Sequence, residues 1–310
     1  MAIEEELARL SPDKDTVLTV GVFDGVHLGH KYLLSELVRQ AREQNLLSGV
    51  VTFRQHPQMV LQPGSRLPFL TDLEERSALL KNEGVDMVIP LTFTPESARL
   101  SAREFVGLLK EHLRMRGLVI GADFALGRNR EGDADTLRAL GEEMGFKVTV
   151  VSPVAVNGEV VSSTAVREAL AKGDMAKVRR LTGRPFSLQG RVIAGAGRGV
   201  ALGFPTANLE VAPEQAIPAD GVYAGWSYID GRTYQAMTNI GQNPTFGDAE
   251  RAVEVYLVDY QGDLYGRRLK VEFVARLRDE KKFATVAELK EQMAEDVKQG
   301  KAILSSEDGR

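Results

Sequence analysis

The chain has 310 residues, a formal net charge of −4 and no cysteine, which excludes disulfides, cysteine-ligated metal centres and a thiol nucleophile. Residues 1–182 carry 23 basic and 25 acidic side chains and residues 183–310 carry 16 and 18, so neither part has the charge of a nucleic-acid-binding domain. The acidic start and the lack of a long apolar run argue against a signal peptide and a membrane span. We therefore expect a cytoplasmic protein with no nucleic-acid or membrane partner, and no obligatory protein partner is inferred.

The first predicted unit is a buried strand, a glycine-bearing turn and an amphipathic helix. Val17, Leu18 and Val20 form an apolar run before the turn at 21–30, and apolar residues then recur at helical spacing at Leu33, Leu34, Leu37 and Val38. A strand, turn and helix in this order bring backbone N–H groups and the positive end of a helix to one point, where a phosphate can bind.

Two glycines and two histidines in this turn suit an anion. Gly25 and Gly29 allow the backbone to approach it closely. His27 and His30, three residues apart at the helix start, can both turn a ring N–H toward it. Two other readings stay open: an ordinary turn with surface or capping histidines, and a metal site. The metal site is weak, because the pattern is not His-Glu-x-x-His and no third ligand follows at a recognisable spacing.

Strands and helices alternate through the following residues. Apolar strands are predicted at 47–53, 85–91, 118–120 and 147–151, and helices at 72–83, 101–113 and 135–144. Pro57 and Pro63 predict a loop after the second strand, and Thr71 is the expected N-cap of the next helix. This alternation indicates a doubly wound parallel sheet, in which ligands bind beyond the carboxyl ends of the strands.

The loops at these strand ends hold the unusual polar residues. His56 follows the second strand, and the loop at 121–130 after the fourth strand contains Asp123 and two arginines. A helix at 165–171, which carries Arg167, is preceded by three hydroxyl residues, Ser162, Ser163 and Thr164. Hydroxyl residues at a helix start are most often N-caps. In the functional interpretation they and the arginine bind a triphosphate at the helix N-terminus.

Three of these stretches resemble a known family in order and spacing. They are Gly-Val-Phe-Asp-Gly-Val-His-Leu-Gly-His at 21–30, Gly-Ala-Asp-Phe-Ala-Leu-Gly at 121–127 and Ser-Ser-Thr-Ala-Val-Arg at 162–167. The first is similar to the signature of the nucleotidyltransferase superfamily. Together they resemble the N-terminal FMN adenylyltransferase domain of bacterial bifunctional riboflavin kinase/FAD synthetases. The family usually has an acidic residue and a proline where this chain has Arg54 and Gln55, which leaves the role of that loop open.

The resemblance implies that ATP binds over the first turn, that the FMN phosphate attacks the α-phosphorus, and that pyrophosphate leaves. The FMN phosphate is already an anion near neutral pH, so this chemistry needs positioning and charge neutralisation rather than a strong base. Catalysis is then expected from His27, His30 and Arg167. Nucleotide or flavin contacts are expected from Gly21, Phe23, Asp24, Gly25, Gly29, Asp123, Ser162, Ser163 and Thr164.

The pattern changes beyond a short predicted helix at 174–181. Gly183 followed by Pro185 is a strong helix stop, so we place a domain boundary between residues 182 and 183. Strands of alternating character are predicted at 186–194, 221–229, 233–239, 253–259 and 270–275, with one helix at 286–297 capped by Thr285. These elements predict a small antiparallel β-barrel with a C-terminal helix.

The glycine-rich stretch at 195–203 fits neither the dinucleotide-binding fingerprint nor a P-loop, and as a bare pattern it is more often a flexible loop. However, several stretches of this half resemble the riboflavin kinase domain of the same family: 203–208, 221–224, 239–247, 253–255, 263–266 and 277–283. The resemblance therefore extends over nearly the whole chain.

For this half, the resemblance assigns the catalytic base to Glu254 and the Mg²⁺ ligands to Thr206 and Asn208. A lone glutamate in a strand more commonly faces solvent, but phosphorylation of a ribityl hydroxyl is helped by a positioned carboxylate. Hydroxyl and amide oxygens are suitable ligands for Mg²⁺. Nucleotide or flavin contacts are expected from Gly203, Pro205 and Asn243.

The expected protein is an enzyme that phosphorylates riboflavin to FMN and then adenylylates FMN to FAD, with ATP as the second substrate of both steps and Mg²⁺ as the cofactor. Residues 1–182 would form the FMN adenylyltransferase domain and residues 183–310 the riboflavin kinase domain. Two alternatives are a chain with only one active half, chiefly the adenylyltransferase, and a non-catalytic flavin- or nucleotide-binding regulator. A nucleic-acid-binding barrel is disfavoured by the acidic charge balance.

Overall fold

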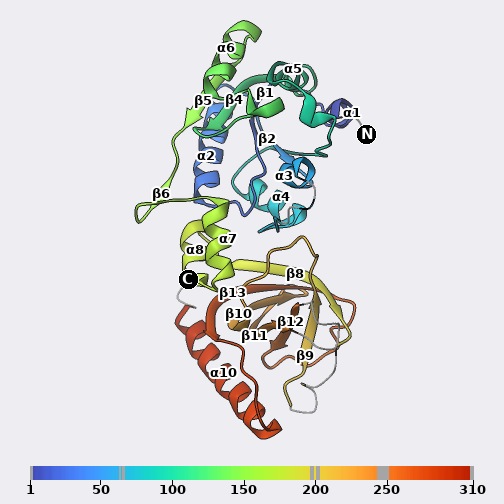
Figure 1. Ribbon diagram of the computed structural model, residues 1–310, viewed down its shortest axis with the longest axis vertical. Helices are drawn as coiled ribbons and strands as arrows, with labels where there is room; N and C mark the ends of the chain where they lie inside the picture. The colour runs from blue at the N-terminus through green and yellow to red at the C-terminus, as the bar shows by residue number, and fades with distance from the viewer. Residues whose placement is uncertain are drawn as a thin grey trace. The chain divides into compact units, whose positions relative to one another are not determined.

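The computed structural model describes residues 3–62, 64, 67–195, 199, 203–242 and 251–307. Its internal contacts divide the chain into two compact units, Met1–Ser163 and Thr164–Arg310. The first contains a parallel sheet and the second a closed barrel (Figure 1). Nearly all of helix α7 (Ser163–Ala171) and the whole of α8 (Met175–Thr182) fall within the second unit.

The sheet of the first unit has five parallel strands in the order β3-β2-β1-β4-β5. They are β1 (Thr16–Val20), β2 (Leu47–Phe53), β3 (Met87–Leu91), β4 (Met115–Gly121) and β5 (Lys147–Val151). Strand β1 is buried along its whole length and pairs with β2 on one side and β4 on the other. The predicted parallel sheet is confirmed, and the 21–30 turn follows its central strand.

Helices cover both faces of this sheet, as a doubly wound fold requires. On one face, α2 (Leu28–Glu43) and α4 (Leu73–Asn82) bury Leu34, Leu37 and Leu80. The other face is covered by α1 (Ile3–Arg9), α5 (Ala102–Leu113) and α6 (Ala134–Met144). The predicted capping box of α5 is present, because Ser101 and Glu104 bond to each other's backbone N–H groups.

The first unit differs from the sequence prediction in its short elements. A short helix, α3 (Pro57–Leu61), stands where a loop was predicted, because proline is compatible with a first helical turn and the His56 Nδ1 atom accepts the Gln58 N–H at 3.2 Å. Asp72, not Thr71, caps α4. The remaining small elements are η1 (Ser97–Arg99), η2 (Arg128–Arg130), β6 (Ala155–Val156) and β7 (Glu159–Val160).

The second unit contains a closed barrel in the order β10-β11-β12-β9-β8-β13. Its strands are β8 (Phe186–Ile193), β9 (Thr206–Glu210), β10 (Gly221–Ile229), β11 (Arg232–Gln242), β12 (Arg251–Leu257) and β13 (Arg268–Arg278). The predicted antiparallel barrel is confirmed, although β9 was not predicted as a strand. Helix α10 (Val286–Glu307) is ten residues longer than expected and packs against β10, β11 and β13 (Figure 1).

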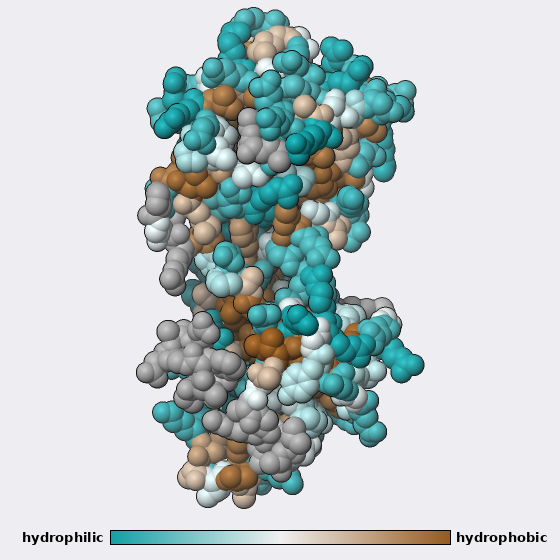
Figure 2. Space-filling view, turned by 90° about the vertical axis from the view of Figure 1, so that its right-hand side faces the viewer, coloured by the Kyte–Doolittle hydropathy of each residue, from teal (hydrophilic) through white to brown (hydrophobic). Residues whose placement is uncertain are grey.

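On the face turned to the viewer in Figure 2, hydrophilic residues cover most of the N-terminal unit, with hydrophobic side chains scattered between them. None of the described helices is both long enough and apolar enough to cross a membrane.

Candidate active sites

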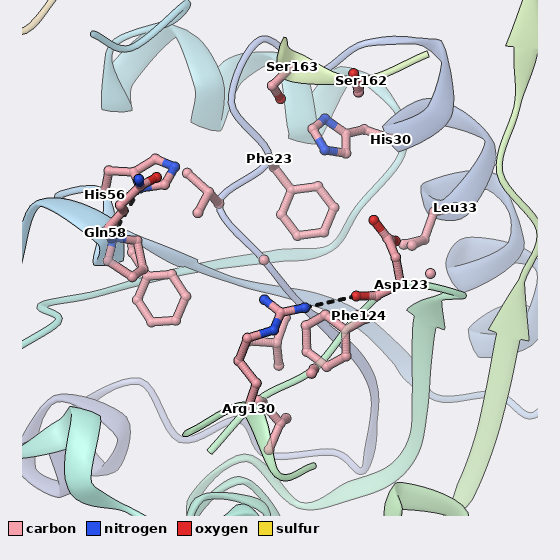
Figure 3. A pocket seen from close by; sticks show the side chains of 18 of the residues that line it. Phe23, His30, Leu33, His56, Gln58, Asp123, Phe124, Arg130, Ser162 and Ser163 are labelled. Carbon is pink, nitrogen blue, oxygen red and sulfur yellow. Dashed lines mark hydrogen bonds between the residues drawn. The ribbon is translucent and has the colours of Figure 1, made fainter. Parts of the chain in front are cut away.

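A cavity of about 1050 Å³ lies at the carboxyl ends of the parallel strands in the first unit (Figure 3). It brings together eight residues that the sequence singles out: Gly21, Phe23, His27, Gly29, His30, Asp123, Ser162 and Ser163. His56 also lines it, at the start of α3. Asp24 and Gly25 do not line it. Thr164 and Arg167 lie on α7 within the second unit.

His27 is both a helix cap and a cavity residue. It is the N-cap of α2, and its Nδ1 atom accepts the His30 N–H at 3.3 Å. A neutral His27 therefore carries its proton on Nε2, where it can donate to a ligand. The rings of His27 and His30 stack with their centroids 3.6 Å apart, and the Phe23 ring lies 5.0 Å from that of His30. The capping interpretation and the ligand interpretation of His27 are thus compatible.

Asp24 holds the turn from inside the protein. Its side chain is buried, and its carboxylate accepts the backbone N–H groups of Leu70 at 2.9 Å and Thr71 at 3.2 Å. The Thr71 hydroxyl in turn accepts the Gly25 N–H at 3.1 Å. Gly25 has a φ of 79°, and a Cβ atom there would lie 2.8 Å from Leu70, so this position requires glycine.

A buried arginine lies beneath this turn. Arg76 donates to the Phe53 carbonyl at 2.6 Å, and its guanidinium lies 5.0 Å from the centre of the Phe69 ring. Burial lowers the pKa of Arg76, and the negative charges of Asp24 and Asp72 oppose that shift. Arg76 and Asp24 are therefore coupled parts of the scaffold under the cavity.

The segment at 161–163, where α7 begins, approaches the first turn. The Ser163 hydroxyl donates to the Asp24 carbonyl at 2.9 Å, which ties the 162–163 segment to that turn. A Cβ atom at Gly29 would lie 3.1 Å from the His27 ring and 3.4 Å from the Val161 carbonyl. A side chain at position 29 would crowd both neighbours. The first turn of α2 carries no acidic side chain, so its positive end is available to an anion.

The loop at 53–57, where the chain departs from the usual family sequence, is fastened to the next strand end. The Gln55 side chain donates to the Phe93 carbonyl at 2.6 Å. Thr92 is held from the other side by Glu6 of α1, whose carboxylate accepts the Thr92 N–H and hydroxyl, each at 2.7 Å. Phe93 lines the cavity and packs edge-on against Phe53, with centroids 5.5 Å apart. Gln55 does not line the cavity itself, but its hydrogen bond holds Phe93, which does.

The loop after β4 contributes Asp123, Phe124 and Arg130 to the cavity wall. Arg130 donates from Nη2 to the Asp123 carbonyl at 3.1 Å (Figure 3). The sequence singles out Asp123 and leaves the two arginines of this loop undistinguished. Only Arg130 lines the cavity, and the left-handed backbone that orients it has no clear signature in the sequence.

The barrel has a second cavity, of about 340 Å³, lined by Thr206, Asn208 and Glu254. In the barrel register Glu254 of β12 stands opposite Asn208 of β9, and Tyr256 stands opposite Thr206. Side chains two residues apart in a strand share a face, so Thr206 and Asn208 point the same way. Glu254 faces this cavity and not open solvent, because Ala252 and Tyr256 on the same face also line it.

Asn208 has an available acceptor. Its side chain is buried, and its Oδ1 atom has no hydrogen-bond partner among the residues that the structure describes. A Cβ atom at Gly195 would lie 1.9 Å from the Asn208 Nδ2 atom, so glycine is needed where this segment passes. Gly203 has a φ of 83° and, like Pro205, does not line the cavity. Asn243 lies outside the described residues.

An ion pair joins α10 to the end of β13 in the cavity wall. Arg278 donates from Nε and Nη2 to the Asp296 carboxylate, at 2.9 and 2.7 Å. The side chains are only 15% and 5% exposed, so this pair is shielded from solvent. Gln292 donates to the same carboxylate at 3.0 Å. Neither the arginine nor the aspartate was singled out in the sequence, since charged residues near a helix usually lie at its surface.

A parallel sheet with an anion-suited turn at its central strand, and a barrel with a hydroxyl, an amide and a carboxylate around one cavity, define a two-domain transferase that uses nucleotides. Family models agree: residues 10–165 match FAD synthetase and residues 182–304 match riboflavin kinase.

Full-length relatives carry both activities in their names. The bifunctional riboflavin kinase/FMN adenylyltransferase of Pseudomonas fluorescens is 40% identical and that of Escherichia coli K12 is 39% identical, over 98% and 92% of each chain. A Streptococcus pneumoniae crystal structure that bears the name macrolide-efflux protein is 32% identical, with a TM-score of 0.88 over 95% of this chain and 96% of that one.

The chain belongs to the bifunctional riboflavin kinase/FMN adenylyltransferase family. It is an enzyme that phosphorylates riboflavin to FMN and adenylylates FMN to FAD, with flavins and ATP as its substrates.

Proposed function

We propose that the cavity of the first unit is the site of adenylyl transfer. The observation that carries this proposal is the meeting of His27, His30 and the start of α2 with Ser162 and Ser163 around one cavity. Ring N–H groups, hydroxyls and the positive end of a helix are all donors for phosphate oxygens. We expect ATP to place its β- and γ-phosphates there.

In this reaction an oxygen of the FMN phosphate bonds to the α-phosphorus of ATP. The bond from that phosphorus to the β-phosphate oxygen breaks, and pyrophosphate leaves. His27, protonated on Nε2, would donate to a phosphate oxygen while its Nδ1 atom remains bonded to the His30 N–H. Arg167 is expected to neutralise charge on the leaving group. Gly21, Phe23, Gly29 and the hydroxyl residues up to Thr164 would shape the nucleotide site, whereas Asp24 and Gly25 would support it from behind.

We propose that the barrel cavity is the riboflavin kinase site, with Glu254 as the base. Its carboxylate would accept the proton of the terminal ribityl hydroxyl while that oxygen attacks the γ-phosphorus and ADP leaves. The position of Glu254 opposite Asn208, inside a cavity, supports this role. A protein that only binds flavin or nucleotide has no need of a carboxylate there.

The residues at this site fit a magnesium ion. The buried Asn208 Oδ1 atom lacks a partner in the described part of the chain, and Thr206 lines the same cavity. An amide oxygen and a hydroxyl are hard ligands of the kind that Mg²⁺ accepts while it keeps several waters. When bound, the ion neutralises phosphate charge. Gly203, Pro205 and Asn243 would complete the nucleotide-binding segment.

We further propose that residues 1–182 and 183–310 act as the two catalytic domains, in the cytoplasm, without an obligatory protein partner. Size-exclusion chromatography and activity of the purified chain alone would test the last point.

The decisive experiment is a time course with riboflavin, ATP and Mg²⁺, in which riboflavin, FMN and FAD are separated by chromatography. FMN should rise and then give way to FAD. His27→Ala and His30→Ala should each slow FAD formation from supplied FMN by about 100-fold or more, while riboflavin phosphorylation continues. Near-normal adenylylation in both variants would refute the first site.

A further inference from the structure

Arg130 is the only lysine or arginine among the described residues that line the cavity of the first unit. The reaction proposed for this cavity brings two phosphorylated nucleotides together. Their negative charges repel each other, and the same wall adds the carboxylate of Asp123. A cation in contact with substrate phosphate would offset this repulsion.

The backbone at Arg130 adopts an uncommon conformation. Asn129 and Arg130 have φ angles of 55° and 59°, so two adjacent non-glycine residues lie in the left-handed region. The loop is fastened on both sides: the Arg128 N–H donates to the Leu100 carbonyl at 2.7 Å, and Leu126 pairs with Gly132. A conformation of this kind costs energy and is kept only where surrounding contacts fix it, and it is frequent at ligand-binding sites.

The guanidinium has donors left for a ligand. One N–H of Nη2 is used by the Asp123 carbonyl, at 3.1 Å. Arginine has five N–H donors, and this guanidinium makes no other hydrogen bond or ion pair within the part of the chain that the structure describes. Its planar fork suits two phosphate oxygens at once.

The direction of Arg130 indicates which phosphate it meets. In Figure 3 its guanidinium points into the cavity from the side opposite His30, Ser162 and Ser163. If the leaving pyrophosphate binds at the histidine and serine end, the attacking group must approach the α-phosphorus from the other side, because the attacking and leaving oxygens lie roughly in line. Arg130 therefore faces the incoming nucleophile.

We propose that Arg130 binds the phosphate group of FMN during adenylyl transfer. This inference rests on the proposed adenylylation site. Arg130 orients the attacking oxygen and reduces its repulsion from ATP, whereas the apolar side chains of the same cavity, among them Phe53, Phe93 and Phe124, suit the flavin ring.

The test uses the full-length enzyme with supplied FMN, ATP and Mg²⁺. Arg130→Ala should raise KM for FMN by about 10- to 100-fold, the effect of losing hydrogen bonds to a charged group. KM for ATP should change less than about twofold. Arg130→Lys should recover part of the loss, because it keeps the charge without the fork. Arg128→Ala is the matched control, since Arg128 lies in the same loop, is exposed and does not line the cavity.

Lumiflavin, which has the flavin ring without the ribityl phosphate, separates phosphate contact from ring contact. Its inhibition constant against FMN should be the same in Arg130→Ala and in the wild type. A parallel loss of FMN and lumiflavin affinity would place Arg130 on the ring and overturn the proposal. A rise in KM for ATP alone, or no change in either KM, would overturn it as well. Failure of the site itself would appear separately, as near-normal adenylylation in both His27→Ala and His30→Ala.

Discussion

Replacement of Asp24 tests how the first turn is held under the cavity of the first unit. The carboxylate is buried, with 2% of the residue exposed, and it accepts the N–H groups of Leu70 and Thr71. Burial lowers the pKa of Arg76, and the negative charge of Asp24 raises it again, which favours the charged guanidinium. Asp24→Asn keeps one oxygen acceptor but turns an NH₂ group toward backbone donors, and Asp24→Ala removes both acceptors.

The expected losses follow from the unpaired groups. One buried N–H without a partner costs about 1–3 kcal/mol, so Asp24→Asn should lower the free energy of unfolding of the first unit by about that amount. Two such groups in Asp24→Ala give about 2–6 kcal/mol. Asp135→Asn is the control: its carboxylate is 91% exposed and pairs with Arg138 at the surface, so the change should stay within ~0.5 kcal/mol.

The chain contains one tryptophan, Trp226 on β10, so tryptophan fluorescence reports only the barrel unit. Urea unfolding followed by far-UV circular dichroism and by fluorescence should therefore separate the two units. Asp24→Asn should shift the dichroism transition to lower urea and leave the fluorescence transition in place. If FAD formation fell while both transitions kept their midpoints, Asp24 would act on the ligand and the scaffold role would be wrong.

Three further predictions concern other parts of the chain. Glu254→Gln should slow riboflavin phosphorylation by about 10²- to 10⁴-fold, because the proton acceptor is lost, and supplied FMN should still become FAD in the chromatographic assay. Asn208→Ala should raise the Mg²⁺ concentration needed for half-maximal kinase activity by about 10-fold or more. Hydrogen bonds from Ser101 lower the pKa of Glu104, so its contribution to stability is complete above the ordinary value of 4.5 and is lost as the pH falls through the lower, folded value. In Glu104→Gln, thermal unfolding should therefore depend less on pH in that acidic range.

Each of these three predictions would be contradicted by a specific result. Loss of both activities in folded Glu254→Gln would contradict the division of labour between the cavities. An unchanged Mg²⁺ requirement in Asn208→Ala would show that this residue is not a ligand of the proposed magnesium ion. If the melting temperature depended on pH equally in Glu104→Gln and the wild type, protonation of the capping carboxylate would not be what lowers stability in acid.

The main elements were predictable because their signals are local and strong. The apolar strand at 16–20, the capping box at Ser101 and the stop at Gly183, which adopts a φ of 73°, all appear as expected. Strand β9 was missed because glycines and Pro205 precede it and only five residues pair, so its identity depends on partners far along the chain. Helix α3 was missed because prolines at 57 and 63 read as a loop.

The sequence was sufficient to predict which strand-end loops meet at the site, but not how each side chain in them is oriented. Parallel strands bring their carboxyl ends to one edge, which placed His27, His30 and Ser162 together. The sequence did not separate Arg130 from Arg128, or show that Asp24 faces inward, because these outcomes depend on backbone angles and tertiary hydrogen bonds.

Strand β9 closes the barrel between β12 and β8, and the same five residues carry Thr206 and Asn208. If this strand detached, β12 and β8 would each present an unpaired edge, open to pairing with another chain. Mutations that displaced this strand from the barrel would therefore expose the molecule to aggregation. Selection for solubility alone should thus help to preserve the backbone of the proposed kinase site, even in a lineage that no longer needs to phosphorylate riboflavin.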